Sequence, residues 1–539
     1  MMAPFHSLRG RVRDRFSGLD SEHPYYRWWV LGSVMIGTFM AVLDMTIVNV
    51  SLAKIIAAFG TDVSKVEWVL TGYLLVFAVM LSASGWVADH FGYKRTYFTA
   101  LLVFTLGSFL CGLAWNINIL ILFRIIQGAG AGFLMPVGMV IVTREFPPEK
   151  RGVALGFWGI SAAASVSFGP LIGGYLIDNF SWHAIFNVNI PVGIFGLVAV
   201  WIIQREYKTE QARYFDIAGF LSLGTFLVFL LLALSEGNAS WNTGGWTSGF
   251  ILTCLSLAAV GLAVFLITDL TIQHPLIDLR LFGHFNFTIN NVVLFIFGMG
   301  MFGSTFLMPL YLQTALGYTA FQSGMVFLPV GILQGIIAPI SGIVSDRANP
   351  KIPLITGLVL LALSFYLNSS MSLYSESFDI MLPLYIRGLG MGMMFTPLST
   401  IALSGIPRHK IGQASGLFNM IRQIGGSFGV AILGTLLVRR EIFHSAVYGQ
   451  SVNQYGPSFQ HISHNLQYFA RQSLSGTASD AAGRAQALIG AHINQQVFVQ
   501  SIDDVFLVAA IIISVGIIPI LFLRVGKPKP GHEAAPMQE

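Results

Sequence analysis

One acidic residue lies deep within a long apolar stretch. Asp44 falls inside the stretch 28–50, whereas the other Asp and Glu residues lie in polar segments or at the ends of apolar stretches. Burial opposes the charged form of a carboxyl group, and a nearby cation favours it. An Asp that alternates between dry and wet surroundings can therefore take up a proton on one side of a membrane and release it on the other. The alternative is an Asp permanently paired with an Arg that serves packing alone.

Three cations also fall inside apolar stretches: Arg124, Arg387 and Arg422. Arg124 is the expected partner of Asp44. Arg387 is nearer the end of its stretch, and we expect its side chain to extend toward water. Arg422 would create a positive field in an apolar cavity, which favours anions and deprotonated weak acids. The alternative for Arg422 is that it caps helix carbonyl groups.

The composition sets the elements that must position these residues. Of 539 residues, 54% are hydrophobic and 10% are charged, against about 25% charged in soluble domains. This excludes a soluble globular enzyme, a disordered chain and a nucleic-acid-binding protein. Repeated apolar stretches indicate an all-α polytopic membrane protein. Cys111 and Cys254 both fall inside apolar stretches, so a disulfide between them is not expected. A metal site is not expected either, because the histidines of 439–501 lack ligand spacing.

We expect fourteen transmembrane helices in a 6+2+6 arrangement. A tail (1–27) precedes a six-helix bundle (28–204), two extra helices with an interfacial helix (205–285), a second bundle (286–524) and a tail (525–539). The Lys and Arg residues gather in the segments on the side of both tails, so both termini should be cytoplasmic. The predicted spans are 28–50, 67–87, 96–115, 118–143, 153–178, 184–204, 216–234, 247–268, 286–311, 323–343, 352–370, 379–402, 414–438 and 502–524.

An internal repeat supports this division. Residues 128–176 match 388–436, for example at Gly128/Gly388 and Pro147/Pro407. Two parallel halves are a transporter architecture with the site between them near the middle of the membrane. The alternative is an ancient duplication in a membrane protein that does not transport.

Two glycine-containing motifs are candidates for moving parts. A cluster between the second and third spans could hold one conformation through hydrogen bonds and ion pairs across the halves, or could be an ordinary positive loop. A Gly-Pro-Gly-Gly segment in the fifth span could bend as a gate, or could serve helix packing alone. The predicted latch residues are Gly85, Asp89, Gly92, Lys94, Arg95, Asp346 and Arg347, and the predicted gating residues are Gly169, Pro170, Gly173 and Gly174.

Adaptable Met and Phe surfaces with a few amides suit promiscuous apolar ligands. Such side chains gather in the ninth, tenth and thirteenth spans, with lipid-facing or packing roles as the alternative. The predicted substrate-binding residues are Phe297, Met301, Phe302, Phe306, Gln334, Asn419, Met420, Arg422 and Gln423.

Segment 274–282 predicts a short amphipathic helix on the membrane surface. The long segment 439–501 should lie on the side opposite the termini. Within it, 481–500 predicts an amphipathic helix that continues into the final span. Such an ordered protruding segment could dock a partner, or could be a passive lid or a disordered insertion.

These motifs together resemble the major facilitator superfamily, and within it the fourteen-span drug:proton antiporters of the EmrB type. The resemblance rests on 43–50, 85–95, 122–128 and 169–174 and covers nearly the whole chain. One departure is His90-Phe91-Gly92-Tyr93, where a basic residue is usual at the first and last positions.

The resemblance implies an exporter of amphipathic drugs in a bacterial inner membrane, driven by the proton gradient without a cofactor. It implies that Asp44 couples protons with Arg124, and that Asp89 and Arg95 form the cytoplasmic latch. It also implies a periplasmic membrane-fusion adaptor and an outer-membrane channel as partners. The alternatives are a dedicated exporter of one endogenous molecule such as a siderophore or lipid, a membrane-embedded enzyme, and a receptor.

Overall fold

The computed structural model describes residues 23, 25–61, 63–207, 214–239, 241–272, 275–404, 406–407, 410–451, 456–473 and 478–524. All regular secondary structure in these ranges is helical, as expected where lipid offers no partner for backbone polar groups. Twelve of the described helices are long and apolar enough to cross a membrane. The all-helical membrane fold is therefore confirmed.

Two predicted spans fall outside that set of twelve, although both form helices within the bundles. The first, α4, begins with Lys94 and Arg95, and the second, α14, contains Asp379 and Arg387. These charges lower the apolar character of both helices. The count of fourteen spans and the domain boundaries stay predictions.

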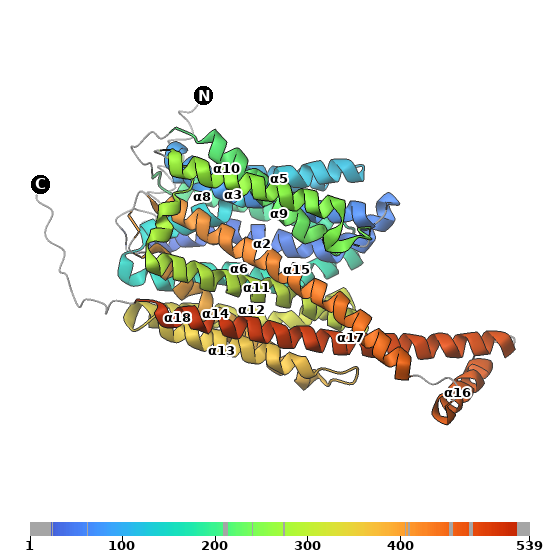
Figure 1. Cartoon of the computed structure of the whole chain (residues 1–539). Coiled ribbons are helices and arrows are strands. Elements are labelled where there is room, and N and C mark those ends of the chain that lie inside the picture. Colours follow the sequence, from blue (N-terminus) through green and yellow to red (C-terminus); the bar gives the residue numbers. More distant parts are fainter. Residues whose placement is uncertain are drawn as a thin grey trace, which may run out of the picture.

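The N-terminal half contains six consecutive helical spans (Figure 1). The helices are α2 (Tyr26–Phe59), α3 (Val63–Phe91), α4 (Tyr93–Cys111), α5 (Ile117–Glu145), α6 (Arg151–Asn179), α7 (Ala184–Asn187) and α8 (Asn189–Ile203). The sixth span consists of a short helix, α7, followed by the longer helix α8.

The C-terminal half repeats this plan with a longer end. Its helices are α11 (Phe285–Thr314), α12 (Ala320–Arg347), α13 (Lys351–Leu367), α14 (Ser377–Leu403), α15 (Ile411–Ser451), α16 (Pro457–Ser473), α17 (Ala478–Val515) and α18 (Ile517–Phe522). α15 and α17 run past the bundle, and with α16 they form a protruding arm (Figure 1). The helix predicted over 481–500 is confirmed as part of α17.

Two helices between the halves, α9 (Ile217–Glu236) and α10 (Gly249–Thr271), pack against each other. α9 also contacts α3 of one half and α15 of the other. The prediction of an interfacial amphipathic helix over 274–282 is wrong. The described part forms only the short turn η4 (Leu279–Gly283), and Leu276, Ile277 and Leu281 are buried against protein instead of facing lipid. His274 lies outside the described residues.

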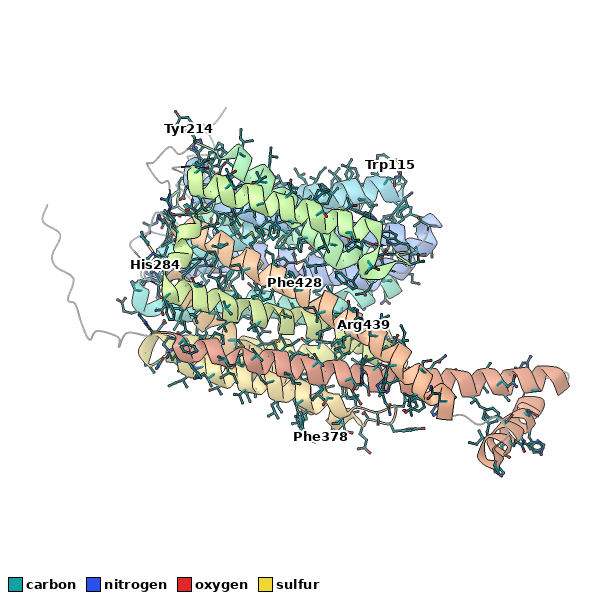
Figure 2. All side chains as sticks on the ribbon, viewed as in Figure 1. Trp115, Tyr214, His284, Phe378, Phe428 and Arg439 are labelled. Atoms are coloured by element: carbon teal, nitrogen blue, oxygen red, sulfur yellow. The ribbon has the colours of Figure 1, made fainter. Side chains whose placement is uncertain are left out.

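The bundle has two polar ends, which we name by the chain. The terminal face is where α2 begins and α18 ends, and the distal face is where the arm protrudes (Figure 1). Exposed aromatic side chains mark both ends, including Trp115 and Phe378 near the distal face and Tyr214 near the terminal face (Figure 2). Aromatic belts of this kind lie at membrane–water interfaces.

Candidate functional site

Asp44 is fully buried and bonded to three side chains from two other helices. Its Oδ2 accepts a hydrogen bond from an NH1 group of Arg124, to which it is ion-paired. Its Oδ1 accepts from Nε2 of Gln127 at 2.8 Å and from Nδ2 of Asn189 at 3.2 Å. Asn189 also donates to the Ser108 hydroxyl at 3.0 Å. The carboxylate of α2 is thus held by α5 and α8, which satisfies a charge that hydrocarbon would otherwise penalise.

Arg124 connects this network to open space. Its Nε donates to the carbonyl of Val69 at 3.1 Å, and its guanidinium lies 4.1 Å from the centre of the Tyr73 ring and 5.7 Å from that of Phe186. One terminal nitrogen, NH2, is buried without a hydrogen-bond partner. Arg124 and Tyr73 both line the main cavity, whereas Asp44 lies behind them. A change in the charge of Asp44 would therefore reach the cavity through Arg124.

The main cavity has a volume of about 270 Å³ and lies between the halves. Its wall includes Met45, Phe77, Met135 and other large adaptable side chains from α2, α3, α5 and α6. α11 and α15 form the opposite side, and α9 closes a third side. Of the predicted substrate-binding residues, those that line it are Met301, Phe302, Arg422 and Gln423.

A second, smaller cavity of about 30 Å³ lies beside the first. Gln334, Met301, Arg387 and Arg422 line it. The structure thus brings five of the nine predicted substrate-binding residues to the two cavities.

The other four predicted residues, Phe297, Phe306, Asn419 and Met420, line neither cavity. Phe297, Asn419 and Met420 lie about one helical turn nearer the terminal face, where the halves close. Phe306 directly follows Thr305, which lines both cavities, and its ring lies near Gly434 of α15. Helix period alone gives the correct face of each helix but not the depth at which the cavity ends.

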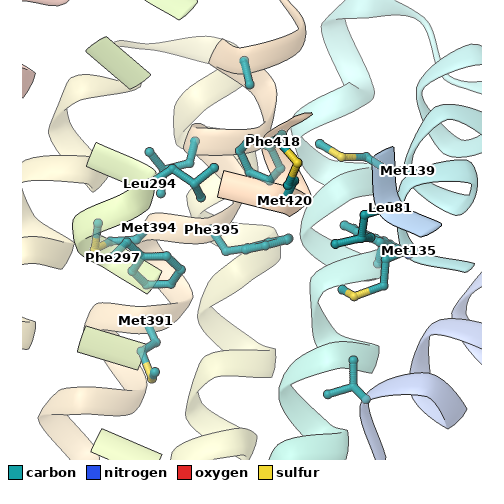
Figure 3. Close-up of a cluster of buried hydrophobic side chains, with 14 of the residues drawn as sticks. Leu81, Met135, Met139, Leu294, Phe297, Met391, Met394, Phe395, Phe418 and Met420 are labelled. Carbon is teal, nitrogen blue, oxygen red and sulfur yellow. The ribbon is translucent and has the colours of Figure 1, made fainter. Parts of the chain in front are cut away.

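A plug of apolar side chains lies between the halves, on the side of the main cavity that is nearer the terminal face. Phe395 and Met420 of the C-terminal half face Met135, Met139 and Leu81 of the N-terminal half (Figure 3). All five side chains are at most 6% exposed. Met420 therefore belongs to the seal between the halves.

Both cations of the second half are buried, and one of them differs from expectation. Arg387 is 1% exposed, so the prediction that it extends to water is wrong. Its Nε donates to Ser364 at 3.1 Å, and its guanidinium lies 4.8 Å from the centre of the Phe365 ring. Arg422 donates through NH2 to Asn419 Oδ1 at 3.2 Å. The acceptor is a side-chain amide, whereas the alternative expectation for Arg422 was a helix carbonyl group.

The two halves contact each other at the terminal face. Asp346, at the end of α12, accepts hydrogen bonds from the backbone nitrogens of Gly152 and Val153 at 3.1 Å each, at the start of α6. On the other side of the same face, Gly85 packs on the backbone of Gly412, and a Cβ at Gly85 would lie 2.8 Å from the Gln413 nitrogen. The halves are therefore joined at this face.

The predicted latch residues Asp89, Gly92, Lys94 and Arg95 lie within the N-terminal half. Asp89 accepts from the Tyr93 hydroxyl at 2.7 Å and lies 3.7 Å from Arg144. Lys94 donates to two carbonyl groups at the end of α8, at Trp201 and Gln204.

Arg95 is 3.5 Å from Glu206. The expectation that Lys94 and Arg95 pair with acids across the halves is therefore wrong in this structure. Gly92 has a φ of 100° and joins α3 to α4. Arg347 is exposed at the end of α12.

Comparison with known proteins identifies the fold. A family model described as the Major Facilitator Superfamily matches residues 34–430. The chain belongs to the Major Facilitator Superfamily. It is similar to the human organic anion transporter MFSD10 in structure, with a TM-score of 0.57 at 12% identity, over 90% of this chain and 99% of that one. At that identity the likeness shows the fold alone.

Bacterial members of the superfamily are similar over nearly their whole lengths. Identity to the multidrug export protein EmrB of Haemophilus influenzae is 32% over 481 residues, or 89% of this chain and 92% of that protein. Identity to the fatty acid resistance protein FarB of Neisseria gonorrhoeae is 31% over 497 residues, or 92% and 95%. This facilitator is therefore a multi-pass membrane transporter, and an enzyme or receptor reading is set aside.

The segment 169–174 of this facilitator continues α6 without interruption, since the helix runs from Arg151 to Asn179 through Pro170. Gly169 and Gly173 lie against α2, and Gly174 lies against Phe321 at the start of α12. These contacts match the packing alternative, and a gating role stays a prediction.

Sequence reasoning missed three contributors to the site. Gln127 and Asn189 bond to Asp44, and their signal was present as amide side chains inside the predicted spans 118–143 and 184–204. The third is α9, which places Leu231, Leu234 and Ser235 in the wall of the cavity. Nothing in the sequence of an inserted helix shows which bundle face it covers.

Proposed function

We propose that this facilitator is a proton-coupled antiporter that exports amphipathic compounds. The observation that carries the proposal is the buried Asp44 network, which contacts the main cavity through Arg124. The cavity is lined by Met, Phe and aliphatic side chains with few polar groups. Such walls suit varied apolar ligands, and the relative EmrB is named as a multidrug export protein.

Protonation of Asp44 supplies the coupling step. While Asp44 is charged, it holds Arg124, Gln127 and Asn189 in one arrangement. Once Asp44 is neutral, the guanidinium of Arg124 loses its counter-charge, and an orientation toward the cavity or the plug becomes more favourable. The two protonation states then favour two conformations, which is the requirement for exchange. Each charge that crosses 100 mV supplies about 2.3 kcal/mol.

The terminal face is the cytoplasmic side in this proposal, as the distribution of Lys and Arg indicates, and the membrane is a bacterial inner membrane. The hydrogen bonds from Asp346 to α6 and the contact of Gly85 with Gly412 then hold the cytoplasmic side closed. These contacts must break for a substrate to enter from the cytoplasm. Substrate and proton therefore use the cavity in turn.

Proton-driven export by purified protein in vesicles tests the proposal. With a dye panel and an imposed proton gradient, wild type should export dye against its concentration gradient, and Asp44→Asn should not. Asp379→Asn, which changes an acid at the start of α14, is the matched control and should export normally. Uphill export by Asp44→Asn at the wild-type rate would refute proton carriage by Asp44.

The arm formed by the ends of α15 and α17 with α16 is a proposed docking surface for a periplasmic membrane-fusion adaptor, itself joined to an outer-membrane channel. This follows from the EmrB resemblance and from the position of the arm on the distal face. A second function, the export of a single endogenous molecule such as a lipid, is favoured by the similarity to FarB, whose name concerns fatty acid resistance. This second function would be supported if, from a panel of varied compounds, the protein exports only one class.

A further inference from the structure

Two buried cations of the C-terminal half, Arg387 and Arg422, have no ion-pair partner in the part of the chain that the structure describes. Arg387 leaves NH1 and NH2 without hydrogen-bond partners, and Arg422 leaves Nε without one. Among the described residues, no carboxylate lies within ion-pairing distance of either guanidinium. A buried guanidinium without a partner is strongly disfavoured. Arg124 in the first half shows the alternative, because it is ion-paired with Asp44.

Both guanidiniums line the same small cavity. Arg387 enters it from α14 and Arg422 from α15, and Gln334 of α12 adds an amide. Its volume of about 30 Å³ has room for about two water-sized groups, since one such group needs about 10–15 Å³. Two oxygen atoms of a carboxylate match that space. The planar guanidinium group also matches the geometry of a carboxylate, to which it can donate two parallel hydrogen bonds.

The small cavity adjoins the main apolar cavity. Five residues line both, namely Ala162, Val166, Met301, Thr305 and Arg422. A molecule with its charged group between the two cations would therefore place its apolar part against the Met and Phe walls of the main cavity.

We propose that Arg387 and Arg422 form a headgroup site for the carboxylate of an amphipathic substrate, whose apolar part occupies the main cavity. The proposal deepens the proposed export function and rests on it, because the ligand is a substrate only if the protein exports it. In this arrangement the carboxylate of the ligand pairs with the cations of the second half as Asp44 pairs with Arg124 in the first half. Gln127, which bonds to Asp44, and Arg387 are equivalent positions of the internal repeat, one residue before Gly128 and Gly388.

Binding of a matched pair of probes tests the headgroup site without any gradient. 2-Naphthoate and 2-naphthamide have the same ring and nearly the same size, and only the first is charged at pH 7. With the full chain in lipid nanodiscs, calorimetry should give naphthoate a Kd about tenfold lower than naphthamide. Equal affinities would overturn the proposal with wild-type protein alone.

Variants locate the site. Arg387→Gln and Arg422→Gln should each weaken naphthoate binding about tenfold and leave naphthamide binding within about twofold. Arg387→Lys, which keeps the charge, should lose less than Arg387→Gln, and Arg439→Gln, an exposed Arg of α15, should bind both probes as wild type does. Equal weakening of both probes by Arg387→Gln would show a packing role and overturn the proposal.

A free small anion is the competing occupant. Acetate should displace naphthoate only at far higher concentration, because it lacks the apolar part. Displacement by acetate and by unlabelled naphthoate at equal concentrations would overturn the assignment to an amphiphile. Carboxylate-selective binding by wild-type protein that shows no proton-driven export in vesicles would uphold the site and refute the export proposal, so the two fail separately.

Discussion

At the scale of single residues, the arrangement around Asp44 concentrates charge and amides in one buried place. Arg124 and two amides satisfy both oxygens of the carboxylate. A network that is satisfied in one protonation state is unsatisfied in the other, because a neutral carboxyl group accepts fewer hydrogen bonds. That difference gives the site two distinct energies, which coupling needs.

Removing one amide should uncouple transport. Gln127→Leu and Asn189→Leu each delete a donor to Asp44, so the charged form loses about 1–3 kcal/mol of stabilisation. We expect uphill export to fall about tenfold, while downhill exchange of the same dye stays near wild type. Asn290→Leu, a buried amide that bonds to the Leu398 carbonyl outside the network, is the control. Equal loss of both transport modes in Gln127→Leu would indicate general damage.

How much of the site the sequence could give depends on the residue. Asp44 and Arg124 could be paired from the sequence because charges are so rare in the apolar stretches. Arg387 could not be placed, because distance from a helix end along the chain does not show which side chains surround it. The same limit explains Phe297 and Asn419, whose helix faces were right and whose depths were wrong.

At the scale of elements, α3 and α15 approach each other through small residues, and α6 and α12 do the same. Helices in lipid associate through such close packing because no hydrophobic effect drives them together. The internal repeat makes Gly152 and Gly412 equivalent positions, although it did not predict that either would contact the other half. It could not predict that α9 would contact α3 and α15 together and form a wall of the cavity.

A methyl group at Gly85 should oppose closure of the terminal face. Its Cβ would lie 2.8 Å from the backbone of Gly412 and Gln413, so the helices must separate. We expect Gly85→Ala to lower the export rate several-fold even though Ala favours helices by about 1 kcal/mol. Gly32→Ala, where nothing lies within 4 Å, gains the same propensity and should export normally. Rates measured side by side in vesicles decide, and a normal rate in Gly85→Ala would contradict the contact.

The cap that Asp346 places on α6 should also control the two conformations. Asp346→Ala removes the acceptor for the Gly152 and Val153 nitrogens, which weakens the closed terminal face by about 1–3 kcal/mol. Spin labels at the exposed positions Glu149 and Asn349, in a cysteine-free background, should then show a larger population at long distance. Arg347→Ala alters the exposed neighbour and should leave the distance distribution unchanged. An identical distribution in both variants would remove Asp346 from the latch.

At the scale of the whole molecule, one end is joined and the other carries an arm. The apolar plug and the glycine contacts close the terminal face, and the main cavity lies on the distal side of that seal. The sequence predicted the all-helical fold because hydrophobic length and the repeat dictate it. It did not predict that α15 would continue as one helix to Ser451, because the amphipathic part after the span carries little apolar signal.

The base of the arm is fixed independently of its tip. Asp504 of α17 accepts from Arg440 Nε at 2.7 Å and lies 2.6 Å from Nε2 of His444, both on α15. These contacts join the two long helices where they leave the bundle. The segment beyond them can therefore be removed without touching the cavity or the Asp44 network.

Deletion of Ser451–Gly476 should separate transport from assembly. The deletion removes α16 and its flanking residues and retains the contacts of Asp504 that hold α15 and α17 together. Because the cavity is intact, proton-driven export in vesicles should match wild type, while co-purification of the cognate membrane-fusion adaptor and resistance of cells should fall at least tenfold. Replacing the same segment with a Gly-Ser linker of equal length controls for spacing, and it should behave as the deletion does, since the surface of α16 is what the adaptor would recognise. Unchanged co-purification and resistance would place the docking surface elsewhere, and lost export in vesicles would show that the arm belongs to the transport cycle itself.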